Sequence, residues 1–243
     1  LPLYRELAYV DADGNEVVKV RDGEILPPES RLTIDPPPEP ESELTAYFPA
    51  TEALPSGEVY VSHVVGDYVD RAAFQAGRRF AGAVRFALPR YDAGGERVGV
   101  VTLLLDARFL QAFTDHQVPT EDRLLVEGDA ASGNYAYVID DRGYVIAHPN
   151  DALIVGLGPT GERVPYARST DELGLRPVRL DQLGFVEPAL VDINAAALDG
   201  SAGSRRYVWD GTDKFVAYAP IPYTGGAYDL PAGFGWVGIG ANV

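Results

Sequence analysis

The chain has 243 residues, a formal net charge of −16 and neither cysteine nor methionine. An acidic surface repels phosphate backbones and anionic lipid headgroups, so the charge argues against a nucleic acid or a membrane surface as a partner. The lack of cysteine excludes thiol catalysis, disulfides and cysteine-ligated metals.

The composition is that of a globular protein, with 46% hydrophobic and 23% charged residues. No apolar run approaches the ~20 residues that a membrane-spanning helix needs, and the longest, such as 98–105, have the length of strands. The chain opens at Leu1, without an initiator methionine or a signal peptide. We therefore expect it to be a segment of a longer protein.

The first half of the chain predicts several strands separated by turns. Residues 7–20 form two β-rich runs around Asp13-Gly14-Asn15, which is the pattern of a hairpin. Prolines exclude a helix from residues 26–40, which we expect to form a surface loop. The other expected elements are a short helix in 44–54 interrupted at Pro49, strands at 59–65, 83–88 and 97–105, and a short helix at 107–113.

An internal repeat organises the whole chain. The sequence AYVDADGNEVV at 8–18 recurs as AYVIDDRGYVI at 136–146, and FALPRYDAGG at 86–95 recurs as YAPIPYTGG at 218–226. In both passes the second segment leads into a glycine-punctuated closing strand. The repeat predicts an α+β fold of two tandem modules, residues 1–116 and 117–243. Each module is expected to be a mostly antiparallel sheet with flanking helices and loops.

The order and spacing of these motifs resemble those of a known family. In the first module the motifs are residues 7–20, Tyr47-Phe48, EVYVS at 58–62 and VRFALPRYDAGGERVGVV at 84–101. In the second they are NYAYVIDDRGYVIAHP at 134–149, WDGTDKFVAYAPIPY at 209–223 and GWVGIGANV at 235–243. This arrangement resembles double Cache domains, which are tandem PAS-like, extracytoplasmic sensor domains of bacterial transmembrane receptors. The long N-terminal helix that leads into the first module of that family is absent from this chain or was trimmed from it.

The resemblance implies a membrane-distal first module and a membrane-proximal second module. It implies a periplasmic or extracellular location, with attachment to the inner membrane only through flanking helices that this chain lacks. It implies a sensor domain that is not itself an enzyme and that binds a small molecule in the distal module. The receptor's output module would be a histidine kinase, with a chemotaxis transducer or a diguanylate cyclase as alternatives. A homodimer in the full receptor is left open.

The candidate ligand-binding residues lie on the central strands of the distal module and on their connecting loop. They are Tyr47, Tyr60, His63, Asp67, Tyr68, Arg79 and Arg85. Arginine can hold a carboxylate through two parallel hydrogen bonds, and tyrosine adds an apolar wall with a polar tip. Arg85 lies in the apolar run AVRFALP, so it needs either a ligand or an acidic partner, such as Asp67 or another acid.

The expected ligand is a small polar molecule, and a carboxylate is one candidate. Dicarboxylate-binding members of the resembled family carry an arginine two residues before the Tyr-Phe pair. Thr45 occupies that position here, which argues against a dicarboxylate.

The proximal module has its own set of polar and aromatic residues. They are Tyr135, Tyr137, His148, Tyr166, Arg168 and Trp209. Tyrosine and tryptophan on strands are more often part of a core than of a pocket. We therefore interpret this set as core, and the proximal module as an element that couples the distal module to the membrane.

No motif in the sequence indicates catalysis, a metal or a cofactor. The three histidines do not have metal-ligand spacing, and neither a GxSxG context nor a phosphate-binding glycine loop is present. Asp11, Asp13, Asn15 and Glu16 fit an Asp-Gly hairpin better than a calcium loop. Two functions of other classes stay open: a module that binds a periplasmic protein and no small molecule, and a secreted hydrolase, for which the sequence offers no polar constellation.

Overall fold

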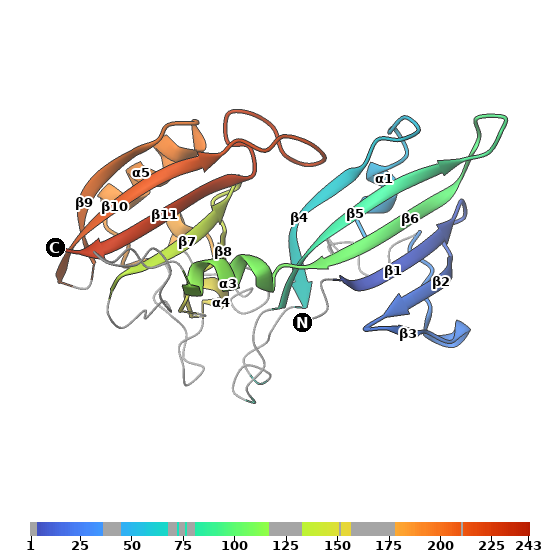
Figure 1. Cartoon of the computed structure of the whole chain (residues 1–243), viewed down its shortest axis with the longest axis horizontal. Coiled ribbons are helices and arrows are strands. Elements are labelled where there is room, and N and C mark those ends of the chain that lie inside the picture. Colours follow the sequence, from blue (N-terminus) through green and yellow to red (C-terminus); the bar gives the residue numbers. More distant parts are fainter. Residues whose placement is uncertain are drawn as a thin grey trace. The chain divides into compact units, whose positions relative to one another are not determined.

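The computed structural model describes residues 4–35, 45–67, 72, 76, 81–116, 133–150, 152–156, 178–209 and 211–243. The chain divides into two compact units, which are described separately (Figure 1). Unit 1 consists of Leu1–Gly66, Gly82–Ala107 and Gly225–Ala227, and unit 2 consists of Asp67–Ala81, Arg108–Thr224 and Tyr228–Val243. Within the described ranges, no helix is both long and apolar enough to cross a membrane.

Unit 1 is built on a six-stranded sheet with the strand order β3-β2-β1-β6-β5-β4. The strands are β1 (Tyr4–Asp11), β2 (Glu16–Arg21), β3 (Glu24–Ile25), β4 (Tyr60–Asp67), β5 (Ala81–Tyr91) and β6 (Arg97–Asp106). The pairs from β3 to β5 are antiparallel. The predicted hairpin and the three predicted strands of this region are therefore confirmed, with β5 longer than expected.

Short helical segments accompany the sheet of unit 1. The proline-rich region contains the 3-10 helix η1 (Pro28–Ser30), and the helix predicted in 44–54 is the single turn α1 (Tyr47–Ala50). Pro49 lies inside that turn, where its missing N–H is not needed for a helical hydrogen bond. Tyr47 and Phe48 of α1 are buried against Val10, Val100 and other apolar side chains of the sheet.

Three hairpin turns of the chain share one design, an aspartate followed three residues later by a glycine. The pairs are Asp11 and Gly14, Asp92 and Gly95, and Asp140 and Gly143. In each turn the aspartate Oδ1 accepts two backbone N–H hydrogen bonds of 2.8–3.0 Å. The glycines have φ of 81°, 86° and 86°, a conformation in which other residues are strained. The Asp11 carboxylate thus closes its own turn, as the hairpin interpretation predicts.

Unit 2 is built on a five-stranded antiparallel sheet with the strand order β8-β7-β11-β10-β9. The strands are β7 (Tyr135–Asp140), β8 (Val145–Ala147), β9 (Gly203–Trp209), β10 (Thr212–Ile221) and β11 (Gly235–Asn242). The helical segments are α3 (Arg108–His116), α4 (Ala152–Val155), η3 (Leu180–Gln182) and α5 (Pro188–Leu198). The repeat is thus seen in both sheets, since β1 and β2 correspond to β7 and β8.

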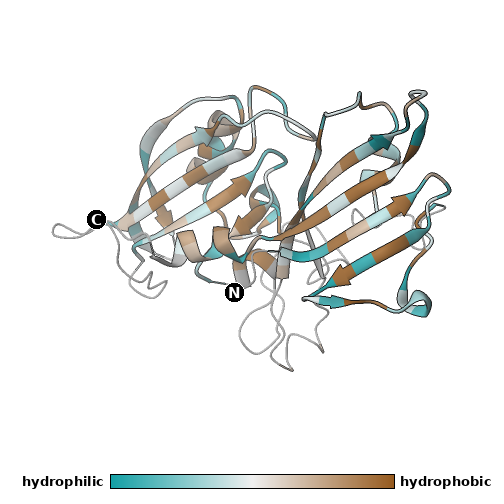
Figure 2. Ribbon diagram, turned by 45° about the vertical axis from the view of Figure 1, so that its right-hand side comes forward, coloured by the Kyte–Doolittle hydropathy of each residue, from teal (hydrophilic) through white to brown (hydrophobic). Residues whose placement is uncertain are grey.

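The core of unit 2 lies between its sheet and α5, which packs against β9, β10 and β11. Trp236 of β11 is fully buried there, and its indole Nε1–H donates a 2.9 Å hydrogen bond to Oδ1 of Asn194 in α5. Buried residues alternate with exposed ones along β10, and Figure 2 shows apolar residues spaced along the strands of both sheets. The alternation is what a sheet with one covered face requires.

The module boundary predicted between residues 116 and 117 stays a prediction. The two compact units divide after Ala107, and α3 belongs to unit 2 because it packs against β7 and β8.

Candidate functional site

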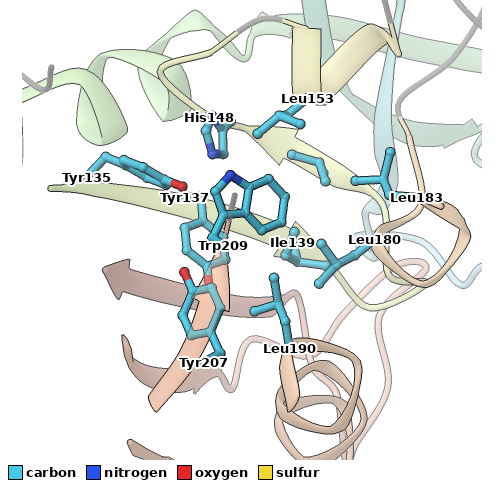
Figure 3. A pocket seen from close by; sticks show the side chains of 11 residues that line it. Tyr135, Tyr137, Ile139, His148, Leu153, Leu180, Leu183, Leu190, Tyr207 and Trp209 are labelled. Atoms are coloured by element: carbon cyan, nitrogen blue, oxygen red, sulfur yellow. The ribbon is translucent and has the colours of Figure 1, made fainter. Parts of the chain in front are cut away.

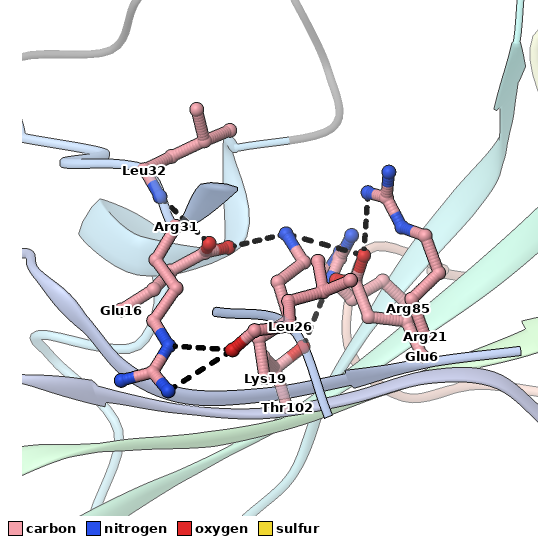
Figure 4. A network of polar contacts seen from close by, with 9 residues as sticks. All are labelled: Glu6, Glu16, Lys19, Arg21, Leu26, Arg31, Leu32, Arg85 and Thr102. Carbon is pink, nitrogen blue, oxygen red and sulfur yellow. Dashed lines mark hydrogen bonds and ion pairs between the residues drawn. The ribbon is translucent and has the colours of Figure 1, made fainter. Parts of the chain in front are cut away.

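Unit 1 buries a cluster of charged side chains on one face of its sheet (Figure 4). Its buried members are Glu6 from β1, Glu16 and Lys19 from β2, Arg85 from β5 and Thr102 from β6, and the half-exposed Arg21 reaches it from the edge of β2. Glu6 shares its side of the sheet with Ala8 and Val10, because side chains alternate along a strand. The cluster therefore lies beside the apolar core of unit 1.

Glu6 is the centre of this cluster. Its Oε1 accepts a 2.9 Å hydrogen bond from Arg85, and its Oε2 lies 2.9 Å from the Arg21 guanidinium and 3.3 Å from the Lys19 ammonium. Burial alone would raise the pKa of Glu6, but the charges of Arg85 and Lys19 and the hydrogen bond from Arg21 lower it to about 2. Glu6 is thus a buried carboxylate held ionised by three bases.

Glu16 connects the cluster to the loop after β3. It forms a 2.6 Å ion pair with Lys19, and its second oxygen accepts the Leu32 N–H at 2.9 Å. Arg31 fixes the same loop, since its guanidinium donates to the Leu26 carbonyl at 3.1 and 3.0 Å (Figure 4). The network orders this part of the proline-rich segment against the sheet.

Arg85 has an acidic partner, as one of the two sequence interpretations required, and the described partner is Glu6. Its Nη1 also donates a 3.0 Å hydrogen bond to Thr102, and its guanidinium carbon lies 4.8 Å from the ring centroid of Tyr47. Its Nε–H is buried and has no hydrogen-bond partner in the described structure. One donor of a buried guanidinium therefore stays unused.

The predicted ligand-binding residues are only partly brought together. Tyr47 and Arg85 are in contact, and the half-buried Tyr60 packs against the same apolar cluster as Tyr47. His63 is a partly buried residue of β4. Asp67 ends β4, but its side chain lies outside the described structure, and Tyr68 and Arg79 lie wholly outside it.

Sequence reasoning missed the three other buried charged members of the cluster, Glu6, Glu16 and Lys19, and the buried Thr102. A signal was present for Glu6, because strict alternation in β1 places it on the same face as Ala8 and Val10. A charged residue at an inward-facing strand position indicates a buried ion pair.

Unit 2 contains a cavity between its sheet and the helical segments that cover it (Figure 3). It is lined by the aromatic residues Tyr135, Tyr137, His148, Tyr207 and Trp209 and the aliphatic residues Ile139, Val145, Leu153, Leu180, Leu183 and Leu190. Its volume is about 30 Å³, which is room for about two water molecules. The cavity is thus small and mostly apolar, with a few polar groups in its wall.

His148 is fixed in the wall of this cavity by its backbone and by one ring nitrogen. Gln111 of α3 accepts its N–H at 3.1 Å and donates to its carbonyl at 2.5 Å. Nδ1 accepts the Asn150 N–H at 2.9 Å, so the neutral ring carries its proton on Nε2. Burial, followed by the positive charge of Lys214, lowers the pKa of His148 to about 3. His148 is therefore neutral, with Nε2–H as a donor.

Tyr137 lies across the neighbouring strand with its hydroxyl buried. A Cβ on Gly238, its partner in β11, would lie 2.8 Å from the hydroxyl oxygen, so only glycine leaves room for the ring. The hydroxyl has no hydrogen-bond partner in the described structure, and burial raises the pKa of Tyr137 well above its usual value. Figure 3 shows the ring directed toward Tyr207.

Lys214 of β10 is a buried cation beside Tyr135. Its ammonium donates to the Gly133 carbonyl at 2.7 Å, lies 3.3 Å from the Asn242 side-chain oxygen and sits 4.6 Å from the centroid of the Tyr135 ring. Burial lowers the pKa of Lys214. No carboxylate pairs with it in the described part of the chain.

The proximal set was interpreted as core from the sequence, and the structure gives its members two roles. Tyr135 and Tyr137 do belong to the hydrophobic core of unit 2. They also line the cavity together with His148 and Trp209. Tyr166 and Arg168 lie outside the described residues. Across the ranges that the structure describes, no three histidine, aspartate or glutamate side chains gather as a metal site.

Comparison with known proteins identifies the fold. No family model and no curated protein matches the sequence. The structure is similar to the extracellular domain of vpHK1S-Z8, a predicted histidine kinase, with a TM-score of 0.56, 13% identity and coverage of 99% of this chain and 68% of that one. It has the same TM-score and identity to a domain of a predicted sensory box/GGDEF family protein from Vibrio parahaemolyticus, with coverage of 99% and 72%.

A third similar structure is the ligand-binding domain of Mlp24 with asparagine, at a TM-score of 0.50 and 15% identity over 98% of this chain and 68% of that one. At such identities the likeness shows a shared fold. It confirms the predicted α+β fold of two tandem modules, which this chain shares with the extracellular domains of sensor proteins.

Proposed function

We propose that this chain is an extracytoplasmic sensor domain of a transmembrane receptor and that it binds a small carboxylate-bearing molecule without catalysis. The shared fold supports this function, since its members include extracellular and ligand-binding domains. A histidine kinase is the proposed output module, with a chemotaxis transducer or a diguanylate cyclase as alternatives. Attachment to the membrane would come from flanking helices outside this chain.

The observation that carries the ligand class is the charge of the buried cluster in unit 1. Among the ion pairs of the described residues, the bases Lys19, Arg21 and Arg85 contact the acids Glu6 and Glu16. A carboxylate beside these bases would gain their electrostatic attraction. The unused Nε–H of Arg85 supplies a hydrogen bond for it, and a charge-assisted bond of this kind is among the stronger ones.

Tyr47 gives the proposed site an apolar wall. It is buried, it lies against the Arg85 guanidinium, and burial raises its pKa, so its hydroxyl stays protonated. An α-amino acid combines a carboxylate with a small body of the size that such a wall can contact. Amino acids therefore come first in the search for a ligand, ahead of simple carboxylates, amines and purines.

A thermal-shift screen of the purified chain against these four classes tests the proposal. A ligand at a hundredfold excess over its Kd stabilises the folded state by about 2.7 kcal/mol, which raises the Tm by roughly 5–10 °C. We expect a hit among carboxylate-bearing compounds. Amines and purines are expected to leave the Tm unchanged.

Two variants assign the hit to the cluster. Arg85→Lys keeps a positive charge for Glu6 but removes Nε–H and the planar guanidinium, so the affinity should fall at least about tenfold. Arg97→Ala is the matched control, because Arg97 also stacks on an aromatic ring, that of Phe48, but lies outside the cluster. The Arg97→Ala variant should bind the compound found in the screen with the same affinity as the original chain. A folded chain that responds to no compound would instead favour a protein partner.

A further inference from the structure

The cavity of unit 2 combines an apolar wall with two polar groups, the Tyr137 hydroxyl and Nε2–H of His148. Tyr137 has a buried hydroxyl without a hydrogen-bond partner among the described residues. His148 uses its backbone and Nδ1 in hydrogen bonds, which leaves Nε2–H as a second donor. A buried donor without a partner costs free energy, so a molecule that supplies acceptors would stabilise this site.

The charge near the cavity favours an anion. Lys214 is buried and lacks a carboxylate partner in the described structure, and its ammonium packs against the Tyr135 ring that lines the cavity. No aspartate or glutamate is among the described lining residues. A cationic ligand would meet the field of Lys214 unfavourably, whereas a carboxylate would be attracted by it.

The volume of the cavity and its aliphatic wall limit the rest of the ligand. The volume corresponds to about two waters, or one molecule of about four or five heavy atoms. Leu153, Leu180 and Leu190 form an aliphatic part of the wall (Figure 3). Beside a carboxylate, an apolar chain of one or two carbons would contact these side chains, and a longer or polar chain would not fit.

We propose that the cavity of unit 2 is a second ligand site, which binds a short-chain monocarboxylate. The carboxylate accepts hydrogen bonds from the Tyr137 hydroxyl and from Nε2–H of His148, and the alkyl chain packs against the leucines. The site is separate from the cluster of unit 1, so it does not depend on the function proposed for that cluster.

Titration calorimetry with propionate on the whole chain tests the proposal, with propionamide as the uncharged analogue of the same shape. Propionate should bind, and propionamide should bind at least about tenfold more weakly, because the amide lacks the charge that Lys214 attracts. Lys214→Met should reduce the preference for propionate over propionamide.

Three variants locate the binding. Tyr137→Phe keeps the ring over Gly238 and removes one donor, so the propionate affinity should fall by about tenfold. Leu153→Phe fills the cavity and keeps both donors, so it should abolish binding even if Tyr137→Phe is poorly folded. Arg97→Ala lies outside both the cavity and the cluster of unit 1 and should leave propionate binding unchanged.

Three results would overturn the assignment. They are equal affinities for propionate and propionamide, no heat of binding from the folded chain, and binding that Arg85→Lys abolishes while Leu153→Phe retains it. The last result would place the carboxylate in unit 1 and would support the proposed function while rejecting the second site.

Discussion

The two units build similar antiparallel sheets but bury charge in opposite ways. In unit 1 the buried acids Glu6 and Glu16 pair with the buried bases Lys19 and Arg85 and with the half-exposed Arg21. Unit 2 buries a lysine that has only neutral partners in the described structure, and it keeps its buried histidine uncharged. Removal of one member of a paired cluster leaves the other buried charge uncompensated, which is costly. The buried lysine of unit 2 is instead held by a backbone carbonyl and a side-chain amide oxygen.

The largest effect is expected from removing the centre of the unit 1 cluster. Glu6→Gln leaves Arg85 and Lys19 buried without their shared carboxylate, which should lower the free energy of unfolding by about 3–5 kcal/mol. Urea unfolding followed by circular dichroism measures the loss. Glu52→Gln is the control, since Glu52 is mostly exposed and lies 3.7 Å from Arg97, and it should cost less than about 1 kcal/mol. A loss that small for Glu6→Gln would mean that the cluster is not a paired network.

The second expected effect is that the stability of the two units depends differently on pH. The pKa of His148 is lowered to about 3, so the unfolded chain takes up a proton below pH 6.5 and the folded chain does not. The contribution of His148 to the free energy of unfolding is fully present above pH 6.5 and declines as the pH falls toward 3. At pH 5 about 2 kcal/mol of it is lost. Glu6 has its pKa lowered to about 2, so its contribution is complete above pH 4.5 and declines only below that value.

Tryptophan fluorescence can follow the pH effect in unit 2, because both tryptophans of the chain, Trp209 and Trp236, belong to it. Unfolding is compared at pH 7.5 and pH 5 for the original chain and for His148→Phe. The variant should lose about 2 kcal/mol less between the two pH values than the original chain. Equal losses would show that His148 does not remain neutral in the folded state.

The smallest effect is expected at an exposed ion pair of unit 2. Arg205 and Asp192 lie 3.9 Å apart, and both side chains are about half or more exposed. Solvent screens such a pair, so Arg205→Gln should change the unfolding free energy by less than about 0.5 kcal/mol. The same fluorescence assay measures it. A loss above 1 kcal/mol would mean that ion pairs of this unit contribute even at the surface.

Much of the fold could be predicted from the sequence, because its signals are local. Alternating apolar runs predicted the strands, and Asp13-Gly14-Asn15 predicted the hairpin turn that the Asp11 carboxylate closes. The repeat between 8–18 and 136–146 gave the two modules. Element ends were less accurate: β5 extends to Tyr91, past the predicted end at residue 88, because it continues to pair with β6 up to the turn.

The sites could be predicted only in part, because they depend on contacts between distant residues. The need of Arg85 for a partner was visible in its apolar strand, but Glu6 lies 79 positions away and becomes its neighbour only through the sheet order. Tyr135 and His148 were correctly grouped with other aromatic residues. These residues surround a cavity because of the way the helical segments pack over the sheet. No local sequence pattern predicts that packing.

We propose that the charged cluster of unit 1 binds a carboxylate-bearing ligand. Hydrogen exchange measured by mass spectrometry, with and without the best compound of the thermal screen, tests it most directly. Bound ligand should slow exchange in peptides from β1, β2 and β5 of the original chain and cause no such change in Arg85→Lys. Protection confined to unit 2, or protection in unit 1 that Arg85→Lys leaves intact, would contradict it.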